Sequence, residues 1–198
     1  MQRLRVTVVG ASGVGKTSLI RAYINNTFTQ DVAPTVLENY STLVRVNEHD
    51  VRLEIQDTAG HDEYDRIRPL SYKRTDVILL CFAVGSPETL KEVFFRWVPE
   101  TRLFAAQAHL VLVGTKIDLR ADVPGEQEAG FEIIQGLPSE EGHFAAERIN
   151  AVQYVECSSR TCEGIKKVFD AAICVGLSRR DRERRANEGF LGGSCAMI

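Results

Sequence analysis

The residues best suited to chemistry lie near the N-terminus, in the stretch Gly10-Ala11-Ser12-Gly13-Val14-Gly15-Lys16-Thr17. This stretch follows a β-like run at residues 4–9 and leads into residues 18–24, which are typical of a helix. A strand, the pattern G-x-x-x-x-G-K-[ST] and a helix together predict a phosphate-binding loop. Small residues let backbone N–H groups turn toward a phosphate, and the helix adds the positive end of its dipole. We expect Lys16 to contact the β- and γ-phosphates of a nucleoside triphosphate and Thr17 to offer its hydroxyl to Mg²⁺.

Two later loops indicate which base the nucleotide carries. Thr115-Lys116-Ile117-Asp118 follows an apolar, strand-like run at residues 109–114. The Asp118 carboxylate can accept from both N–H donors on the Watson–Crick edge of guanine, which adenine cannot offer together, and the stem of Lys116 can lie along the base. Glu156-Cys157-Ser158-Ser159 follows another strand-like run, where backbone N–H groups could meet the guanine carbonyl. These loops favour guanine and disfavour an ATP-dependent enzyme.

The remaining motif is Asp57-Thr58-Ala59-Gly60, which closes a strand-like run at residues 51–55. It places a carboxylate for Mg²⁺ and a flexible glycine near the γ-phosphate. Four motifs in this order resemble the small GTPases of the Ras superfamily. The resemblance implies GTP or GDP and Mg²⁺ as ligands, with Mg²⁺ held by Thr17, Thr35 and Asp57. The residues that it places at the nucleotide are Gly10, Ala11, Ser12, Gly13, Val14, Gly15, Lys16, Thr17, Ser18, Phe28, Thr35, Asp57, Gly60, Thr115, Lys116, Asp118, Leu119, Ser158 and Ser159.

Hydrophobic periodicity predicts one α/β domain. Strands fit near residues 3–9, 40–47, 50–56, 77–84, 109–114 and 152–156, and helices near 16–26, 87–105, 139–150 and 162–177, with a weaker helix after Gly60. Strands that alternate with helices imply a parallel sheet with helices on both faces. We therefore expect a P-loop NTPase fold (a G domain) at residues 1–177, with a mostly parallel six-stranded sheet and one antiparallel edge strand. All four motifs fall at the carboxyl ends of strands, where such sheets bind ligands.

Composition sets limits on the class of protein. A length of 198 residues suits one domain and a tail, and the net charge of −3 argues against nucleic-acid binding as the main activity. No apolar run approaches the roughly 20 residues that a membrane span needs, and the N-terminus does not resemble a secretory signal. We expect a monomer on the cytosolic side of the membrane. No cysteine spacing suggests zinc, and we expect Cys81, Cys157 and Cys174 to be buried free thiols.

Two segments narrow the resemblance to the Rho family, which implies a role in cytoskeleton or polarity control. Residues 28–40 resemble its first switch, in which Thr35 reaches Mg²⁺ and the γ-phosphate and Phe28 packs near the guanine; a plain core contact is the alternative for Phe28. Residues 61–72 resemble its second switch. Effector proteins are therefore expected to bind near residues 30–40 and 61–72, and an exchange factor, a GTPase-activating protein and a GDP-dissociation inhibitor to act on the protein. Residues 122–138 fit the Rho-type insert, for which a solvated loop is the alternative.

Two positions depart from the family pattern where catalysis takes place. The resemblance implies Lys16, Thr35, Gly60 and His61 as catalytic residues, but the family carries glutamine at the position of His61 and glycine at that of Ser12. The glutamine orients the attacking water, and any side chain at position 12 crowds the γ-phosphate. We therefore expect GTP hydrolysis to GDP and phosphate that is impaired, with nucleotide binding retained. The alternative is a constitutively GTP-loaded interaction module that is regulated by abundance or membrane release.

The C-terminal segment, residues 178–198, is expected to be a flexible basic tail. Residues 178–185 contain five arginines and two acidic residues, and the chain ends in Cys195-Ala196-Met197-Ile198. Such an ending resembles a CaaX box, which implies prenylation of Cys195. One lipid chain alone binds a membrane only marginally, so the basic residues would supply the second signal. The expected location is the cytoplasmic face of the plasma membrane, with a cytosolic pool.

Overall fold

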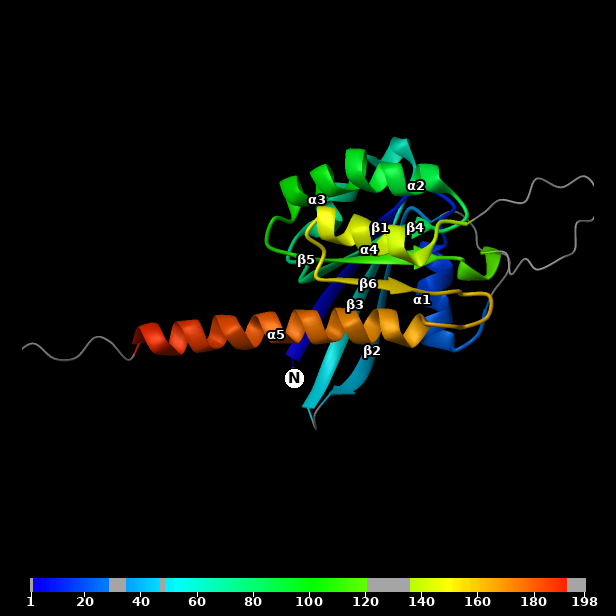
Figure 1. Ribbon diagram of the computed structural model, residues 1–198. Helices are drawn as coiled ribbons and strands as arrows, with labels where there is room; N and C mark the ends of the chain where they lie inside the picture. Colours follow the sequence, from blue (N-terminus) through cyan, green and yellow to red (C-terminus); the bar gives the residue numbers. More distant parts are fainter. Residues whose placement is uncertain (1, 29–34, 47–48, 121–135, 192–198) are drawn as a thin grey trace, which may run out of the picture.

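The computed structural model describes residues 2–28, 35–46, 49–120 and 136–191, which form a six-stranded sheet between two layers of helices (Figure 1). The strands are β1 (Gln2–Gly10), β2 (Leu37–Val46), β3 (His49–Thr58), β4 (Val77–Ala83), β5 (His109–Thr115) and β6 (Gln153–Glu156). Their spatial order is β2-β3-β1-β4-β5-β6; β2 runs antiparallel to β3, and every other neighbouring pair is parallel. The predicted α/β fold, with its antiparallel strand at one edge, is confirmed.

Helices cover both faces of this sheet. One face carries α1 (Lys16–Asn25) and α5 (Ile165–Leu191), and the other carries α2 (Pro87–Glu92), α3 (Val98–Phe104) and α4 (Ser139–Arg148) (Figure 1). The helix expected at 87–105 is present but contains a π-helical turn, η3 (Val93–Trp97), between α2 and α3. The weaker helix expected after Gly60 consists of two short 3₁₀ turns, η1 (Asp62–Tyr64) and η2 (Arg68–Tyr72).

The sequence of β4 explains its central place. It reads Val-Ile-Leu-Leu-Cys-Phe-Ala and is buried along its whole length, as expected of a parallel strand covered on both faces. Val77 and Leu79 join the core beneath α1 and α5, whereas Ile78 and Leu80 join the core beneath α2, α3 and α4. Two cores thus cover the two faces of the sheet, and the connecting loops lie at the carboxyl ends of its parallel strands.

Helix α5 differs from its prediction at both ends, since it begins at Ile165 and continues to Leu191. A Cβ on Gly176 would lie 2.3 Å from Leu4, so the helix packs closely on β1, and Arg180 forms an ion pair with Asp76 at 2.6 Å. The helical backbone therefore extends through most of the segment that we expected to be a flexible tail. The boundary between domain and tail stays a prediction. Cys195 and most of the insert expected at 122–138 lie outside the described residues, so the lipidation and the insert stay predictions as well.

One prediction about the cysteines was wrong. Cys81 and Cys157 are buried as expected, but Cys174 is exposed. Its neighbour Ile173 faces the core, so the following residue of the helix turns away from it. Although α5 is 27 residues long, neither it nor any other helix in the described ranges combines the length and apolar character needed to cross a bilayer.

Candidate functional site

The loop between β1 and α1 is packed tightly against β4. Gly10 has φ +150°, and a Cβ there would lie 2.2 Å from the carbonyl oxygen of Cys81. Gly15 has φ +96°, a left-handed conformation that glycine adopts without strain, directly before α1 begins at Lys16. These glycines let the chain leave β1 and enter α1 within a short loop. The free N–H groups at the start of α1 are then available to an anion.

Lys16 is held inside this loop with an exposed fraction of only 7%. Its Nζ donates to the carbonyl oxygens of Gly10 and Ala11, at 2.8 Å each. Burial lowers the pKa of the ammonium from its ordinary value. Because the two carbonyls carry no formal charge, the cation retains its attraction for an anion, and a phosphate beside it would favour the charged form.

The three residues expected to hold Mg²⁺ lie together. Thr17 Oγ1 donates to Asp57 Oδ2 at 2.5 Å and lies 2.8 Å from Thr35 Oγ1. Asp57 Oδ1 is buried and has no hydrogen-bond partner among the described residues, and burial raises the pKa of the carboxyl. An unpartnered carboxylate oxygen beside two hydroxyls is an oxygen-only set of the kind that Mg²⁺ prefers. The residues present therefore fit the ion.

A cavity of about 550 Å³ borders Lys16, Thr17 and Thr35, whereas Asp57 is not among the residues that line it. Most of the residues expected to contact phosphate and Mg²⁺ border it, together with Thr58, Glu63 and Tyr64, which were not among the predicted site residues. The predicted residues in its lining are Ser12, Gly13, Gly15, Lys16, Thr17, Ser18, Thr35, Gly60, His61 and Lys116. Ser12 and His61, the two departures from the family pattern, thus border the same cavity.

Gly60 brings the segment after β3 into direct contact with the phosphate loop. A Cβ at this position would lie 2.5 Å from both Ala11 C and Ser12 N and 2.6 Å from Gly10 O. Separations below 3 Å leave no room for a side chain, so only glycine permits this approach of backbone to backbone. His61 follows directly and is exposed at the cavity.

The two loops expected to bind the base are tied to the phosphate loop and to each other. Thr115 Oγ1 donates to Val14 O at 2.6 Å, and Lys116 Nζ donates to Gly13 O at 2.6 Å. Ser158 Oγ donates to Asp118 Oδ1 at 2.5 Å. Asp118 and Ser158 do not border the phosphate cavity, and neither do Phe28, Leu119 and Ser159.

Phe28 has an exposed fraction of 40% and belongs to neither core. This excludes the alternative of a plain core contact and leaves the ring free to meet a ligand.

A comparison with protein families decides the relationship. The model of the Ras family matches residues 5–175, from β1 into α5. The chain belongs to the Ras family. This Ras-family protein is a small GTPase, a GTP-binding switch. Members of its family generally bind GTP or GDP with Mg²⁺, and they bind effectors, exchange factors and GTPase-activating proteins. The resemblance to the Ras superfamily inferred from the four motifs is confirmed.

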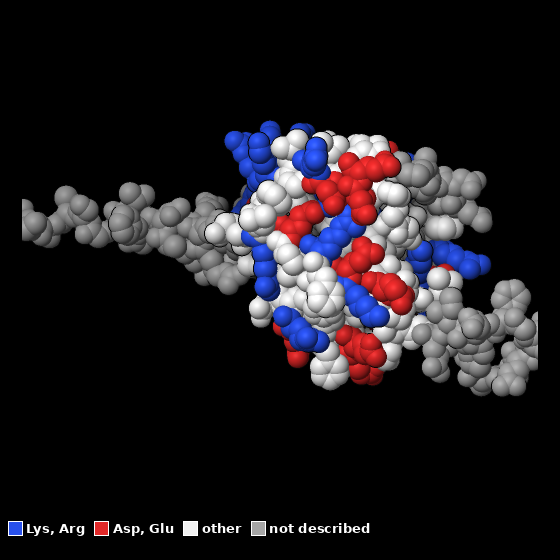
Figure 2. Space-filling view, turned by 90° about the horizontal axis from the view of Figure 1, so that it is seen from above, with Lys and Arg blue, Asp and Glu red and all other residues white. Residues whose placement is uncertain are grey.

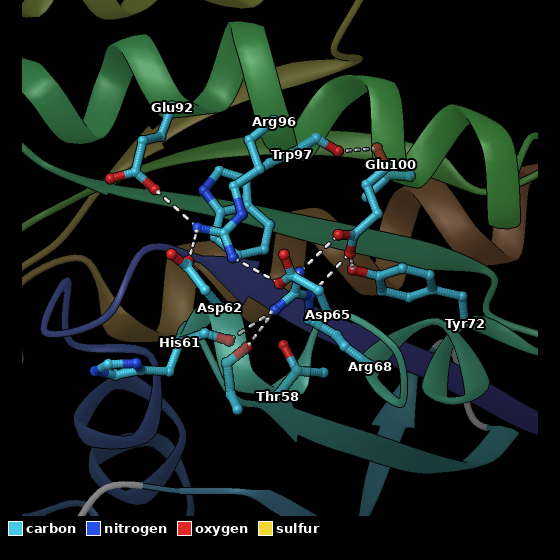
Figure 3. Close-up of polar contacts among 12 residues, drawn as sticks. Thr58, His61, Asp62, Asp65, Arg68, Tyr72, Glu92, Arg96, Trp97 and Glu100 are labelled. Atoms are coloured by element: carbon cyan, nitrogen blue, oxygen red, sulfur yellow. Dashed lines mark hydrogen bonds and ion pairs between the residues drawn. The ribbon is translucent and has the colours of Figure 1, made fainter.

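Sequence reasoning missed a polar network behind the cavity (Figure 3). Its centre is Arg68 of η2, which has an exposed fraction of 3%. The Arg68 guanidinium donates to both carboxylate oxygens of Glu100 on α3, at 2.8 and 2.6 Å, and to Asp65 at 2.6 Å. It also donates to the carbonyl oxygens of Ala59 at 3.1 Å and His61 at 3.5 Å, the two residues that flank Gly60. Arg68 therefore ties the backbone around the cavity to α3.

Further residues extend this network onto the π-helical turn. Arg96 forms ion pairs with Asp62 at 2.5 Å and Asp65 at 2.7 Å, and the Tyr72 hydroxyl donates to Glu100. The guanidinium carbons of Arg68 and Arg96 each lie 4.5 Å from the ring centroid of Trp97. In Figure 2 acidic and basic side chains intermingle on the face seen from above, instead of forming fields of one sign.

Proposed function

We propose that this Ras-family protein is a Rho-type, Mg²⁺-dependent GTP switch whose hydrolysis is slow. The observation that carries the proposal is the cavity that Ser12 and His61 share with Lys16, Thr17 and Thr35. The first two residues depart from the family pattern, and the other three keep it. Binding should therefore be retained while the chemical step is weakened.

The retained residues have distinct roles in this proposal. Lys16 binds the β- and γ-phosphates, and Thr17, Thr35 and Asp57 hold Mg²⁺, which neutralises charge on the phosphate oxygens. Asp118 accepts hydrogen bonds from the two N–H donors of guanine. The buried position of Lys16 and the unpartnered Oδ1 of Asp57 support these roles. Each group is shielded from water and can still interact with a ligand, the ammonium with an anion and the carboxylate oxygen with a cation.

The two departures act on the same transition state. The family's glutamine orients the water that attacks the γ-phosphate in line. An imidazole at His61 can hold a water, but its ring nitrogens lie at other positions and its charge depends on pH. A side chain on Ser12 occupies space that the water-orienting residue and an incoming arginine finger need, and loss of such a finger alone removes roughly 10³–10⁵ in rate.

A four-protein cycle tests the proposal: wild type, Ser12→Gly, His61→Gln and the double variant. Each single restoration should recover little, because the other defect remains, and the double variant should exceed the product of the single gains. The measurement is single-turnover phosphate release, with GTP affinity as the control that should change little. A wild type as fast as the double variant would show that His61 is a competent substitute.

The surface supports Rho-type signalling through effectors near residues 30–40 and 61–72. Val36, Leu37, Ile67 and Leu70 expose large apolar side chains there. Large apolar side chains exposed on the segments expected to bind effectors favour a protein partner. The γ-phosphate would order both segments and so make binding depend on GTP. Cytoskeleton or polarity control is the pathway that the Rho resemblance implies.

The proposed place of action is the cytoplasmic face of the plasma membrane, with a cytosolic pool. Prenylated Cys195 supplies one membrane signal, and the arginines of residues 179–185 supply the other. The support is the sequence alone: a terminal Cys-Ala-Met-Ile after a segment with five arginines and two acidic residues.

A second candidate is a GTP-loaded interaction module that hardly turns over. The shared cavity of Ser12 and His61 favours it as well, since both departures act against hydrolysis. The nucleotide recovered from purified protein separates the candidates: a slow switch yields mostly GDP, whereas the interaction module yields GTP.

A further inference from the structure

An ion pair beyond the phosphate cavity joins the two loops proposed to bind guanine. The first loop runs from Thr115 to Arg120, through the 3₁₀ turn η4 (Ile117–Leu119), and the second begins at Glu156. The Nη1 and Nη2 atoms of Arg120 donate to the two carboxylate oxygens of Glu156, at 2.8 and 2.7 Å. A bidentate pair of this kind fixes direction as well as distance.

The surroundings hold this pair in one arrangement. The Tyr154 hydroxyl donates to Glu156 Oε1 at 2.7 Å, and Arg120 Nε donates to the carbonyl oxygen of Leu137 at 3.0 Å. The two charged side chains are 29% and 20% exposed. Burial alone would raise the pKa of Glu156, but the hydrogen bonds from Arg120 and Tyr154 hold it below its ordinary value. The carboxylate is therefore charged near neutral pH and accepts three hydrogen bonds.

Two further hydrogen bonds connect the same loops closer to the carboxylate of Asp118, which is proposed to bind the base. Ile117 N donates to Cys157 O at 3.3 Å, and Ser158 Oγ donates to Asp118 Oδ1 at 2.5 Å. Asp118 is exposed and Ser158 is buried, so the serine orients the carboxylate. That orientation holds only while the two loops keep their relative position.

We propose that Arg120 and Glu156 are positioning residues for guanine selectivity, because their ion pair keeps Ser158 and Asp118 in register. The inference rests on the proposed role of Asp118 in base recognition. A pair that stabilised the fold alone would, when lost, weaken all nucleotides alike. A pair that places Asp118 would, when lost, weaken most the nucleotide that uses both of its hydrogen bonds.

Inosine diphosphate separates these two roles. Hypoxanthine keeps the N1–H of guanine and lacks the 2-amino group, so it offers Asp118 one donor in place of two. Wild type should prefer GDP over IDP, and the preference should depend on the position of Asp118. The ratio of the two affinities is thus a readout that general destabilisation does not change.

The experiment uses the full chain with Mg²⁺ and compares Arg120→Ala, Glu156→Gln and Arg120→Lys. In the first two variants we expect GDP affinity to fall about tenfold, a modest loss because the pair is partly exposed, and the GDP-to-IDP ratio to fall at least about threefold. Arg120→Lys keeps the charge without the bidentate geometry and should lie between them and wild type. The matched control is Arg5→Ala, which breaks the 2.8 Å pair with Glu54 on β1 and β3, where the exposed fractions are 32% and 24%.

The possible outcomes are distinct. If wild type shows no preference for GDP over IDP, the proposed base recognition by Asp118 fails. If wild type shows the preference and Arg120→Ala and Glu156→Gln both keep it, the positioning proposal is overturned, whatever their melting temperatures. Glu156→Gln preserves the size of the side chain and one acceptor oxygen, so it keeps the test decisive if Arg120→Ala does not fold. A fall in the ratio for the Arg120 and Glu156 variants but not for Arg5→Ala supports the proposal.

Discussion

Replacing Arg68 with alanine should lower the free energy of unfolding by about 3 kcal/mol. The Arg68 side chain is 1% exposed and that of Glu100 is 14% exposed, so this pair is largely withdrawn from water. Removing one member of a buried pair costs about 3–5 kcal/mol because the other charge stays behind without its partner. The lower end applies here, since Glu100 keeps its hydrogen bond from Tyr72 and the second acidic partner, Asp65, is 48% exposed.

The protein contains its own probe for this measurement. Trp97 is the single tryptophan of the sequence, and Arg68 lies 4.5 Å from its ring centroid, so intrinsic fluorescence reports on the network directly. Unfolding in urea and by heat should be followed at one fixed nucleotide concentration, because a ligand of the folded state adds to its stability. For a chain of this size, 3 kcal/mol corresponds to a fall in Tm of about 6–12 °C.

Arg66→Ala is the matched control, because Arg66 is an exposed arginine in the same segment. Its unfolding free energy should stay within about 0.5 kcal/mol of wild type. Glu100→Gln keeps the size of the partner without its charge and should lose less than Arg68→Ala. A Tm of the Arg68→Ala protein within about 1–2 °C of wild type would refute the view that this arginine ties the segment after β3 to α3.

Four other outcomes are expected. Asp118→Asn should weaken GTP and strengthen xanthosine triphosphate, whose ring offers an acceptor where guanine has its amino group; an unchanged preference in a competition assay would remove Asp118 from the site. Cys195→Ser should move the protein from membranes to the cytosolic fraction, and equal solubility of both forms would reject lipidation. Gly60→Ala places a Cβ 2.5 Å from Ala11 C and should slow single-turnover hydrolysis at least about tenfold, since a 1 Å displacement can remove roughly 10²-fold in rate. The free energy of unfolding should fall as the pH drops below about 4. Because the pKa of Glu156 is lowered in the folded protein, its ion pair stabilises the fold above the ordinary pKa of a glutamate and is lost when the carboxylate is protonated. Acid unfolding curves of wild type and Glu156→Gln should therefore converge at low pH.

The sequence predicted the fold and the phosphate side of the site because their signals are local. The fully apolar run of β4 indicates a strand covered on both faces. The spacing of glycines, lysine and threonine in the loop after β1 indicates a phosphate-binding loop. Parallel strands then bring Asp57 and Thr17 to one edge of the sheet without any further information. The hydrogen bond of 2.5 Å between them agrees with that placement.

The Arg68 network has no such local signal. The length of α5 has one, its helix propensity, but the prediction relied on charge instead. Arg68 and Glu100 are 32 positions apart and meet through a segment of short 3₁₀ turns, which periodicity does not place. For residues 178–191 we weighed charge and expected a flexible tail. Arginine, glutamate and alanine are also strong helix formers, and this propensity favours the continuation that the structure has.

Because Cys81 is buried, its rate of chemical labelling can report on opening of the core next to the phosphate loop. Its thiol has no exposed surface, and burial raises its pKa to about 12. The thiolate is the form that attacks an alkylating reagent, so Cys81 is protected both by exclusion of the reagent and by its bound proton. Cys162 and Cys174 are exposed and should react first.

Slow alkylation of Cys81 therefore times the transient opening of the core between the sheet and helices α1 and α5 in the folded protein. Because α1 begins at Lys16, directly after Gly15, that opening also disturbs the loop proposed to hold the phosphates. Added GDP should lengthen the labelling time in proportion to its binding, while the labelling of Cys174 stays constant. A native sulfur atom thus measures how strongly the nucleotide and the centre of the sheet are coupled.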